Sequence, residues 1–364
     1  MRPTKAIIDL NALRHNFKRV QEIASNSRVI AVVKANAYGH GLSQIAKALP
    51  DAEMFAVATP AEAYTLRRAG INQPILLLEG FFEEKELLKI VDNDLQVVIH
   101  HTPQVEALKR LKTDKKVNIW LKIDSGMNRL GFKVDELPHI EKELLGIECI
   151  HKPIRLMSHF ASADDVKDAF TSEQLSRFLE TTEHLVLERS MANSAGILEA
   201  ENAHFDWVRP GLMLYGCSPM INTTGSDYGL KPVMSLESQI MSIKHLKKGE
   251  STGYGRHWFA EKDTVIGLVA IGYGDGYPRN AKNGTPVWVN GRQVPLVGRV
   301  SMDMLAVELG PDYAEKIGER VVLWGKELPA EIVASYADTI PYTLSCGVTG
   351  RVPFVYRGRK NTGS

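Results

Sequence analysis

The chain has 364 residues, a length typical of two domains. Hydrophobic residues make up 44% and charged residues 24%, which argues against a disordered or fibrous chain. Lys and Arg number 44 against 43 Asp and Glu, so the net charge of +1 provides no global basic field to hold nucleic acid or an anionic membrane.

The cysteines and the apolar runs indicate where such a chain works. Cys149, Cys217 and Cys346 lie far apart and form no CxxC pair, so neither a disulfide framework nor a metal site is expected. The N-terminus lacks the pattern of a secretory signal, and no apolar run reaches the ~20 residues of a membrane span. We therefore expect a cytoplasmic protein.

From residue 10 to about 220, short β-branched runs alternate with longer amphipathic stretches. Helices are predicted over Leu42–Leu49 and Ala61–Ala69, the second closed by Gly70. The predicted strands are Val29–Val33, Phe55–Ala58, Ile75–Leu78, Leu95–His100, Val117–Ile123, Ile154–Ser158, Arg189–Asn193 and Met213–Tyr215. Strands that alternate with helices in this number predict a (β/α)8 TIM-like barrel, although a doubly wound sheet would give a similar pattern.

After about residue 225 the pattern changes to strands separated by turns. Asn290-Gly291 is a strong hairpin signal within this region. The predicted strands are Val233–Ile243, Thr264–Ile271, Pro286–Val289, Val294–Val297, Met304–Glu308 and Arg320–Leu323. We expect an α/β barrel domain over residues 1–225 and a mostly β domain over 226–364, with which the first few residues could pair.

A lysine at the end of a predicted strand is the first candidate for chemistry. Lys34 directly follows Val29–Val33, and the loop after it contains Tyr38. Barrels hold their active sites at the carboxyl ends of the strands, where a partly desolvated amine is suited to Schiff-base chemistry. A surface lysine that closes a strand is the alternative.

Further polar residues follow other predicted strands. Arg129, in the loop after Lys122, could clamp a carboxylate with two hydrogen bonds, although the Lys122 charge would repel it and a solvated cation pair is the alternative. The hydroxyl of Ser194 and the backbone amides of Gly211 and Leu212 could form a phosphate cradle. Each signal is weak alone, but several successive loops carry such residues just after strands.

Together these segments resemble a known family. VVKANAYGHG, LKIDSGMNRLGF, SHFASAD, FDWVRPGLMLYG, GYGR, AIGYGDGYPR and VGRVSMDM are similar to the signature segments of bacterial alanine racemases, in order across nearly the whole chain. The resemblance implies a homodimeric isomerase with shared active sites that interconverts L-alanine and D-alanine.

The resemblance also implies a cofactor and its contacts. Pyridoxal 5′-phosphate would form a Schiff base, or aldimine, with Lys34, and Tyr254 of the partner subunit would be a second base on the opposite face of the substrate. Arg209 would bind the pyridine nitrogen, supported by His159, and cations such as this pair would help Tyr254 to act as a base. The phosphate contacts implied are Tyr38, Ser194, Gly211, Leu212 and Tyr342.

The substrate site implied by the resemblance uses both domains. Arg129 and the backbone N–H of Met302 would hold the alanine carboxylate. Lys122 matches a lysine that is often carbamylated in the family, and the resulting anion would orient Arg129 rather than repel it. The residues expected at the entrance are Asp164, Tyr273, Arg279 and Arg299.

Two other functions remain open at this point. A broad-specificity or serine racemase would share the chemistry and differ around the substrate side chain. A non-catalytic pyridoxal-phosphate carrier would lack the β domain. The sequence does not separate a role in D-alanine supply for peptidoglycan from one in alanine breakdown.

Overall fold

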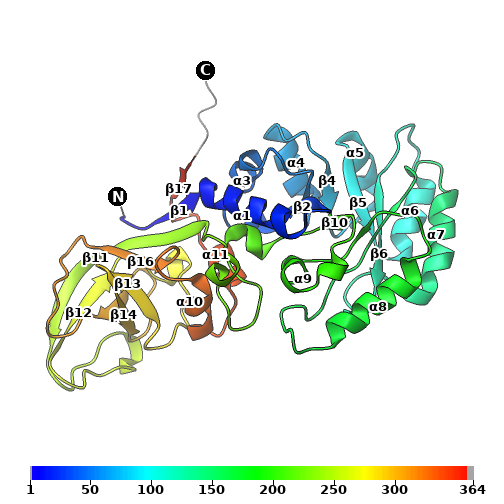
Figure 1. The fold of residues 1–364 in the computed structure, drawn as a ribbon. Helices are drawn as coiled ribbons and strands as arrows, with labels where there is room; N and C mark the ends of the chain where they lie inside the picture. The colour runs from blue at the N-terminus through cyan, green and yellow to red at the C-terminus, as the bar shows by residue number, and fades with distance from the viewer. Residues whose placement is uncertain (1, 359–364) are drawn as a thin grey trace.

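The computed structural model describes residues 2–358 and contains a closed parallel barrel beside a β domain (Figure 1). Each barrel strand pairs in parallel with its neighbour, and the last one pairs with β2 to close the ring. The ring follows the order β2 (Arg28–Val32), β3 (Met54–Val57), β4 (Ile75–Leu77), β5 (Leu95–Ile99), β6 (Ile119–Asp124), β8 (Arg155–Met157), β9 (Arg189–Ser190) and β10 (Trp207–Val208). The TIM-like barrel is thus confirmed, and the doubly wound alternative is wrong.

Helices cover the outside of the barrel, as Figure 1 shows, and local signals fix their ends. The capping box of Thr59 and Glu62 starts α4, with Pro60 in its first turn, and Gly70 ends it at φ +85°. The helices of this domain are α1 (Leu10–Ile23), α3 (Leu42–Ala48), α4 (Pro60–Arg68), α5 (Leu87–Asp92), α6 (Thr102–Arg110), α7 (Leu137–Gly146), α8 (Phe170–Thr182) and α9 (Ser194–Glu199). A short strand, β7 (Phe132–Lys133), pairs with the end of β6.

One predicted strand is wrong. Met213–Tyr215 belongs to a 3-10 helix, η4 (Leu212–Tyr215), and the eighth strand is the two-residue β10 just before it. Three consecutive buried apolar residues do not distinguish a strand from a helical turn. Here the N–H of Met213 donates to Ser194 Oγ, and Gly216 at φ +86° ends the turn.

The second domain is an eight-stranded, mainly antiparallel sheet within the described chain. Asn290 and Gly291, at φ +44° and +84°, form the expected hairpin between β13 and β14. Its strands run in the order β12 (Thr264–Val269), β15 (Leu305–Glu308), β14 (Arg292–Val297), β13 (Pro286–Val289), β16 (Arg320–Trp324), β11 (Met234–Leu246), β1 (Lys5–Asp9) and β17 (Phe354–Arg357). The mostly β character expected for this region is confirmed.

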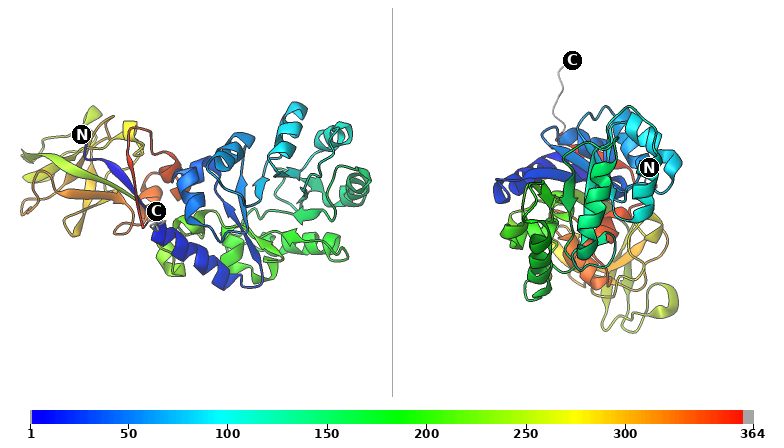
Figure 2. Two further views of the ribbon diagram at one scale, coloured as in Figure 1. Left: turned by 90° about the horizontal axis from the view of Figure 1, so that it is seen from above. Right: turned by 90° about the vertical axis from the view of Figure 1, so that its right-hand side faces the viewer.

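Both ends of the described chain lie in the β domain. β1 pairs antiparallel with β11 and parallel with β17, and the chain then enters the barrel through α1 (Figure 2). Two helices that the sequence analysis did not predict, α10 (Ala330–Tyr336) and α11 (Pro341–Cys346), lie between the β sheet and the barrel. In residues 2–358 we find no helix long and apolar enough to cross a membrane.

Candidate active site

The chain after Lys34 folds into a left-handed helical turn. Instead of an open loop, Ala35 to Tyr38 all have φ between +51° and +55°. Left-handed helical backbone costs roughly 1–2 kcal/mol for each residue other than glycine, so neighbouring contacts must hold this segment in place. Gly39 makes one such contact possible, because a Cβ there would lie 2.1 Å from the carbonyl oxygen of Ser345 in α11.

The turn opens into a cavity of about 560 Å³ at the carboxyl ends of the barrel strands. Segments following β2, β4, β6, β8, β9 and β10 all line it, and α11 contributes from the other domain. The structure brings together ten of the residues predicted from sequence: Lys34, Tyr38, Lys122, Arg129, His159, Asp164, Ser194, Arg209, Gly211 and Tyr342.

Positive charge dominates the cavity lining. Its lysines and arginines are Lys34, Lys122, Arg129 and Arg209, and the only carboxylates among the described lining residues are Glu79 and Asp164. Burial, followed by the charges of Arg209, Arg129 and Lys34, lowers the pKa of Lys122 to about 7. An anionic ligand, or a negative charge placed on Lys122 itself, would relieve this repulsion.

Arg209 is fixed at the cavity wall by four acceptors. Nη1 donates to Ser190 Oγ at 2.5 Å, and Nη2 donates to the carbonyl oxygens of Ser158 at 2.5 Å and Met191 at 3.2 Å. Nη2 also lies 3.3 Å from Nδ1 of His159. Burial lowers the pKa of Arg209 to about 10, so the guanidinium stays charged at neutral pH.

His159 differs from the expectation in its charge. Burial, and then the charge of Arg209, lowers the pKa of His159 well below its usual value. This shift favours the uncharged imidazole at neutral pH, in place of the expected His159–Arg209 pair of cations. Arg209 alone carries that charge.

Small groups shape another part of the cavity wall into a cradle. The N–H groups of Gly211, at 2.9 Å, and Met213, at 3.3 Å, both donate to Ser194 Oγ. A Cβ on Gly211 would lie 2.6 Å from Tyr38 Oη, so glycine at this position makes room for the Tyr38 hydroxyl. The side chain of Leu212 instead lines a neighbouring cavity, so only its backbone could serve the cradle.

The loop that carries Arg129 is shaped by a buried carboxylate. Asp124 Oδ1 accepts hydrogen bonds from the N–H groups of Gly126 and Asn128, and its Oδ2 accepts one from Lys133 Nζ. These bonds bring the loop back over the end of β6 and direct Arg129 to the cavity.

The remaining predicted residues lie on the β domain and do not line this cavity. Tyr254 and Met302 are 70% and 51% exposed. Their loops are packed together, because a Cβ on Gly253 would lie 3.1 Å from the Arg299 nitrogen, and the N–H of Tyr273 donates to the carbonyl oxygen of Ser301. Arg279 lies over the Tyr273 ring at 5.9 Å. One chain therefore holds two separate sets of candidate residues.

Glu79 and Ile340 are among the residues of the cavity wall that were not predicted as site residues. Glu79 follows β4, so the rule applied to the other strands would have found it. Ile340 lies just before α11, a helix that was not predicted, and no sequence signal indicated it.

An eight-stranded barrel whose cation-lined cavity opens at the carboxyl ends of its strands, joined to a β domain, defines a two-domain barrel enzyme. Residues 8–219 match the family model for the alanine racemase N-terminal domain, and residues 233–356 match that for the C-terminal domain. The chain belongs to the alanine racemase family, as the resemblance of its motifs indicated.

Relatives match over almost their whole length. Alanine racemase of Vibrio parahaemolyticus is 48% identical over 98% of this chain and 99% of its own. The crystal structure of biosynthetic alanine racemase from Pseudomonas aeruginosa has a TM-score of 0.95 and 44% identity, covering 98% of this chain and all of that one. Alanine racemase from Bartonella henselae, solved with covalently bound pyridoxal phosphate, has a TM-score of 0.89 and 30% identity, covering 98% of this chain and all of that one.

Proposed function

We propose that this chain is an alanine racemase that interconverts L-alanine and D-alanine with two bases on opposite faces of the substrate. The observation that carries the proposal is the cavity in which Lys34, at the end of β2, meets Arg129, Arg209 and the Ser194 cradle. The match to alanine racemases over both domains favours a racemase that acts on alanine over a non-catalytic carrier.

The cavity fits pyridoxal 5′-phosphate. Gly211 makes room for the Tyr38 hydroxyl, the cradle offers a second hydroxyl and backbone amides, and the excess of cations over carboxylates favours an anion. Lys34 would hold the aldehyde carbon, Arg209 the ring nitrogen, and the phosphate contacts would be Tyr38, Ser194, Gly211, Leu212 and Tyr342. When bound, the cofactor supplies an electron sink for the substrate carbanion.

The protein's own residues would move the protons. Once the substrate amine has replaced it at the aldehyde carbon, the free amine of Lys34 would take the α-proton from D-alanine. The partner subunit's Tyr254 would take it from L-alanine, and each base would return a proton in the opposite direction. Arg129 and the backbone N–H of Met302 hold the carboxylate, so the α-carbon is fixed between the two bases. A carbamate on Lys122 would orient Arg129 and offset the surrounding positive charge.

Arg209 limits side reactions because it is a donor that keeps its proton. A guanidinium with a pKa of about 10 does not give its proton to a ring nitrogen at neutral pH. By leaving the ring nitrogen unprotonated, Arg209 would limit the strength of the electron sink and so limit side reactions.

The complete site would need two copies of the chain. Tyr254 and Met302 are exposed on one protomer and lie outside its own cavity, which supports a head-to-tail homodimer in which each β domain completes the partner's site. Asp164, Tyr273, Arg279 and Arg299 would then line the entrance. We assign the enzyme to the cytoplasm, and the domain boundary to residue 225, between the two segments that match the family models.

Incubation of cofactor-loaded protein with L-alanine in deuterium oxide tests the proposal. Circular dichroism and α-deuterium content are followed together, with Lys34→Ala as the control. Loss of optical activity with deuterium uptake supports racemisation. Uptake with retained handedness, or neither change, contradicts the two-base mechanism on alanine, and the same assay with serine then tests the broad-specificity alternative.

A further inference from the structure

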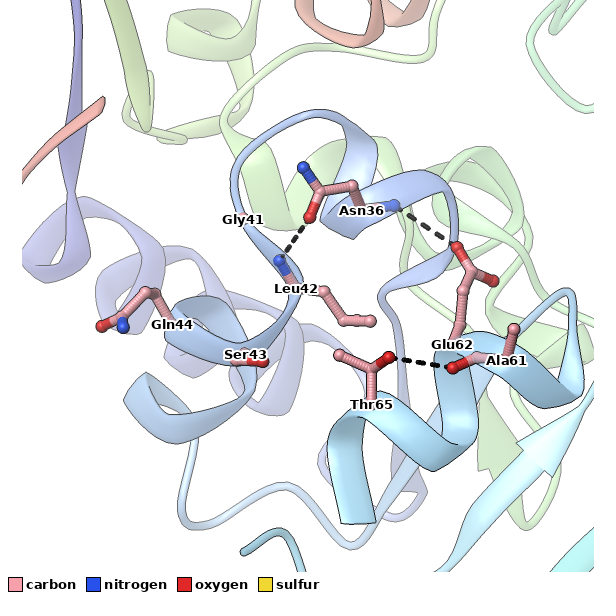
Figure 3. Close-up of a pocket in the computed structure, with 8 residues that line it drawn as sticks. All are labelled: Asn36, Gly41, Leu42, Ser43, Gln44, Ala61, Glu62 and Thr65. Atoms are coloured by element: carbon pink, nitrogen blue, oxygen red, sulfur yellow. Dashed lines mark hydrogen bonds between the residues drawn. The ribbon is translucent and has the colours of Figure 1, made fainter. Parts of the chain in front are cut away.

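The left-handed turn after Lys34 is attached to the next βα unit by one carboxylate, which Figure 3 shows. Glu62 lies in the first turn of α4, where its Oε2 accepts hydrogen bonds from the N–H groups of Ala58 at 3.0 Å and Thr59 at 3.3 Å. Its other oxygen, Oε1, accepts a longer bond of 3.4 Å from the N–H of Asn36, within the turn. The two oxygens of one side chain therefore join adjacent barrel loops.

Asn36 in turn connects Glu62 to the far end of the turn through two further hydrogen bonds. Its Oδ1 accepts a hydrogen bond of 2.9 Å from the N–H of Leu42 at the start of α3, and its carbonyl oxygen accepts one from Gly41. Glu62 and Asn36 line an open groove on the outer side of the turn and do not line the catalytic cavity. Any effect they have on the cavity must pass through the backbone of the turn.

The left-handed backbone of the turn needs support from contacts of this kind. Lys34 begins the turn and Tyr38 ends it, and both side chains line the cavity. If the four left-handed residues relaxed to the ordinary right-handed conformation, both side chains would point elsewhere. We propose that Glu62 is a positioning residue, which holds the turn in its left-handed form and thereby aims Lys34 and Tyr38 into the cavity. The catalytic meaning of this role rests on the function proposed above.

The Glu62 carboxylate and the N–H groups of Ala58, Thr59 and Asn36 form a clamp, and one substitution can release the turn from it. Glutamine at position 62 would have one acceptor oxygen and one donor NH₂ group. Two N–H groups, of Ala58 and Thr59, compete for that oxygen at the helix end, so the NH₂ group would face the N–H of Asn36. Glu62→Gln should therefore keep the cap of α4 and release the turn.

Two variants serve as matched controls. Glu86 is also half-buried and closes a capping box, with a single oxygen, Oε2, accepting from the N–H groups of Phe82 and Glu83. Glu86→Gln keeps that oxygen and touches no part of the turn. Thr59→Ala removes the hydroxyl that accepts the N–H of Glu62 and so weakens the α4 cap without removing the carboxylate.

The first measurement is hydrogen exchange by mass spectrometry on the cofactor-free proteins. We expect the amides of residues 34–42 to exchange about tenfold faster in Glu62→Gln, as loss of one hydrogen bond to a charged group implies, and at the wild-type rate in Glu86→Gln and Thr59→Ala. In the loaded enzyme, Glu62→Gln should lower kcat roughly tenfold to a hundredfold, leave KM for alanine nearly unchanged and speed release of the cofactor, followed by its visible absorbance.

The outcomes separate this inference from the proposed function. If the amides of residues 34–42 exchange at the wild-type rate in Glu62→Gln, Glu62 does not hold the turn. Faster exchange with unchanged kcat and cofactor release would overturn its positioning role. If residues 34–42 exchange faster in Glu62→Gln but the wild-type protein does not racemise alanine, the structural role of Glu62 stands and the proposed function is overturned instead.

Discussion

Arg209 Nη2 and His159 Nδ1 lie 3.3 Å apart, and burial leaves them in different charge states. The pKa of Arg209 is lowered only to about 10, whereas that of His159 is lowered well below its usual value. The pair is therefore a cation held against a neutral acceptor. In this arrangement Arg209 keeps a fixed orientation and acts as a hydrogen-bond donor.

Replacing Arg209 tests whether a donor that keeps its proton limits side reactions. Arg209→Glu should lower racemisation and raise the ratio of transamination to racemisation, because a carboxyl group can protonate the ring nitrogen. Arg209→Lys keeps a cationic donor and should leave that ratio near the wild-type value. The ratio does not depend on the amount of folded protein, and an unchanged ratio in Arg209→Glu would contradict the proposed role.

Removing one base should affect the two substrates differently. In Tyr254→Phe, Lys34 can still exchange the α-proton of D-alanine with solvent, whereas abstraction from L-alanine should slow by roughly 10²–10⁴-fold. The primary isotope effect should be larger from L-alanine than from D-alanine. Tyr336→Phe, at another exposed tyrosine outside the barrel, is the control. Equal loss of exchange from both enantiomers would argue against two bases.

Mixing two inactive variants tests whether the site is shared between subunits. Lys34→Ala and Tyr254→Phe each remove one base, but a mixed dimer would contain one site with both bases intact. After denaturation and joint refolding, random pairing should restore about a quarter of the wild-type activity. No recovery, in samples that sedimentation shows to be dimeric, would mean that Lys34 and Tyr254 act within one chain.

The lowered pKa of Lys122 predicts a dependence on carbon dioxide. Because its pKa is about 7, the neutral amine increases as the pH rises through 7, and only the neutral amine adds to CO₂ to give a carbamate and a proton. Stripping CO₂, or lowering the pH below about 7, should raise the KM for alanine. A ¹³C carbamate signal from labelled bicarbonate should vanish in Lys122→Ala and persist in Lys115→Ala.

At the opposite end of the barrel, a carboxylate is important for stability. Burial alone would raise the pKa of Glu188, but hydrogen bonds from Arg28, Trp207 and Arg155 outweigh it and lower the pKa to about 2. The stabilisation is present above the ordinary value of 4.5 and is lost as the pH falls from 4.5 to 2. Glu188→Gln should lower the free energy of unfolding at pH 7 by about 1–3 kcal/mol, measured by urea titration, and flatten this acid dependence.

Sequence reasoning found the barrel strands that are long and fully buried, such as β5 and β6, because parallel strands form continuous apolar runs. It failed at β10, whose two residues are too short for any period, and placed the strand on Met213–Tyr215 instead. Length alone does not explain this failure, because the equally short β9 was found within the predicted strand Arg189–Asn193.

The site was predictable where a polar residue directly follows a strand, as Lys34 does. The left-handed conformation of the next four residues was not, because alanine, asparagine and tyrosine do not require it and distant contacts impose it. The grouping of Tyr254 with Arg299 depends on packing between loops 45 residues apart in sequence, which no local pattern encodes.

The pairing of β1 with β11 and β17 has a consequence for synthesis of the chain. A ribosome makes residues 5–9 first, yet these residues must wait for the strands at 234–246 and 354–357 before they have partners. The barrel can close while the nascent chain is still attached, but the sheet of the second domain lacks its outermost strand, β17, until the last residues emerge. A fragment beginning after the barrel would expose the edge of β11 and leave β17 without a neighbour, so the β domain should aggregate when expressed alone and become soluble when residues 2–9 are supplied.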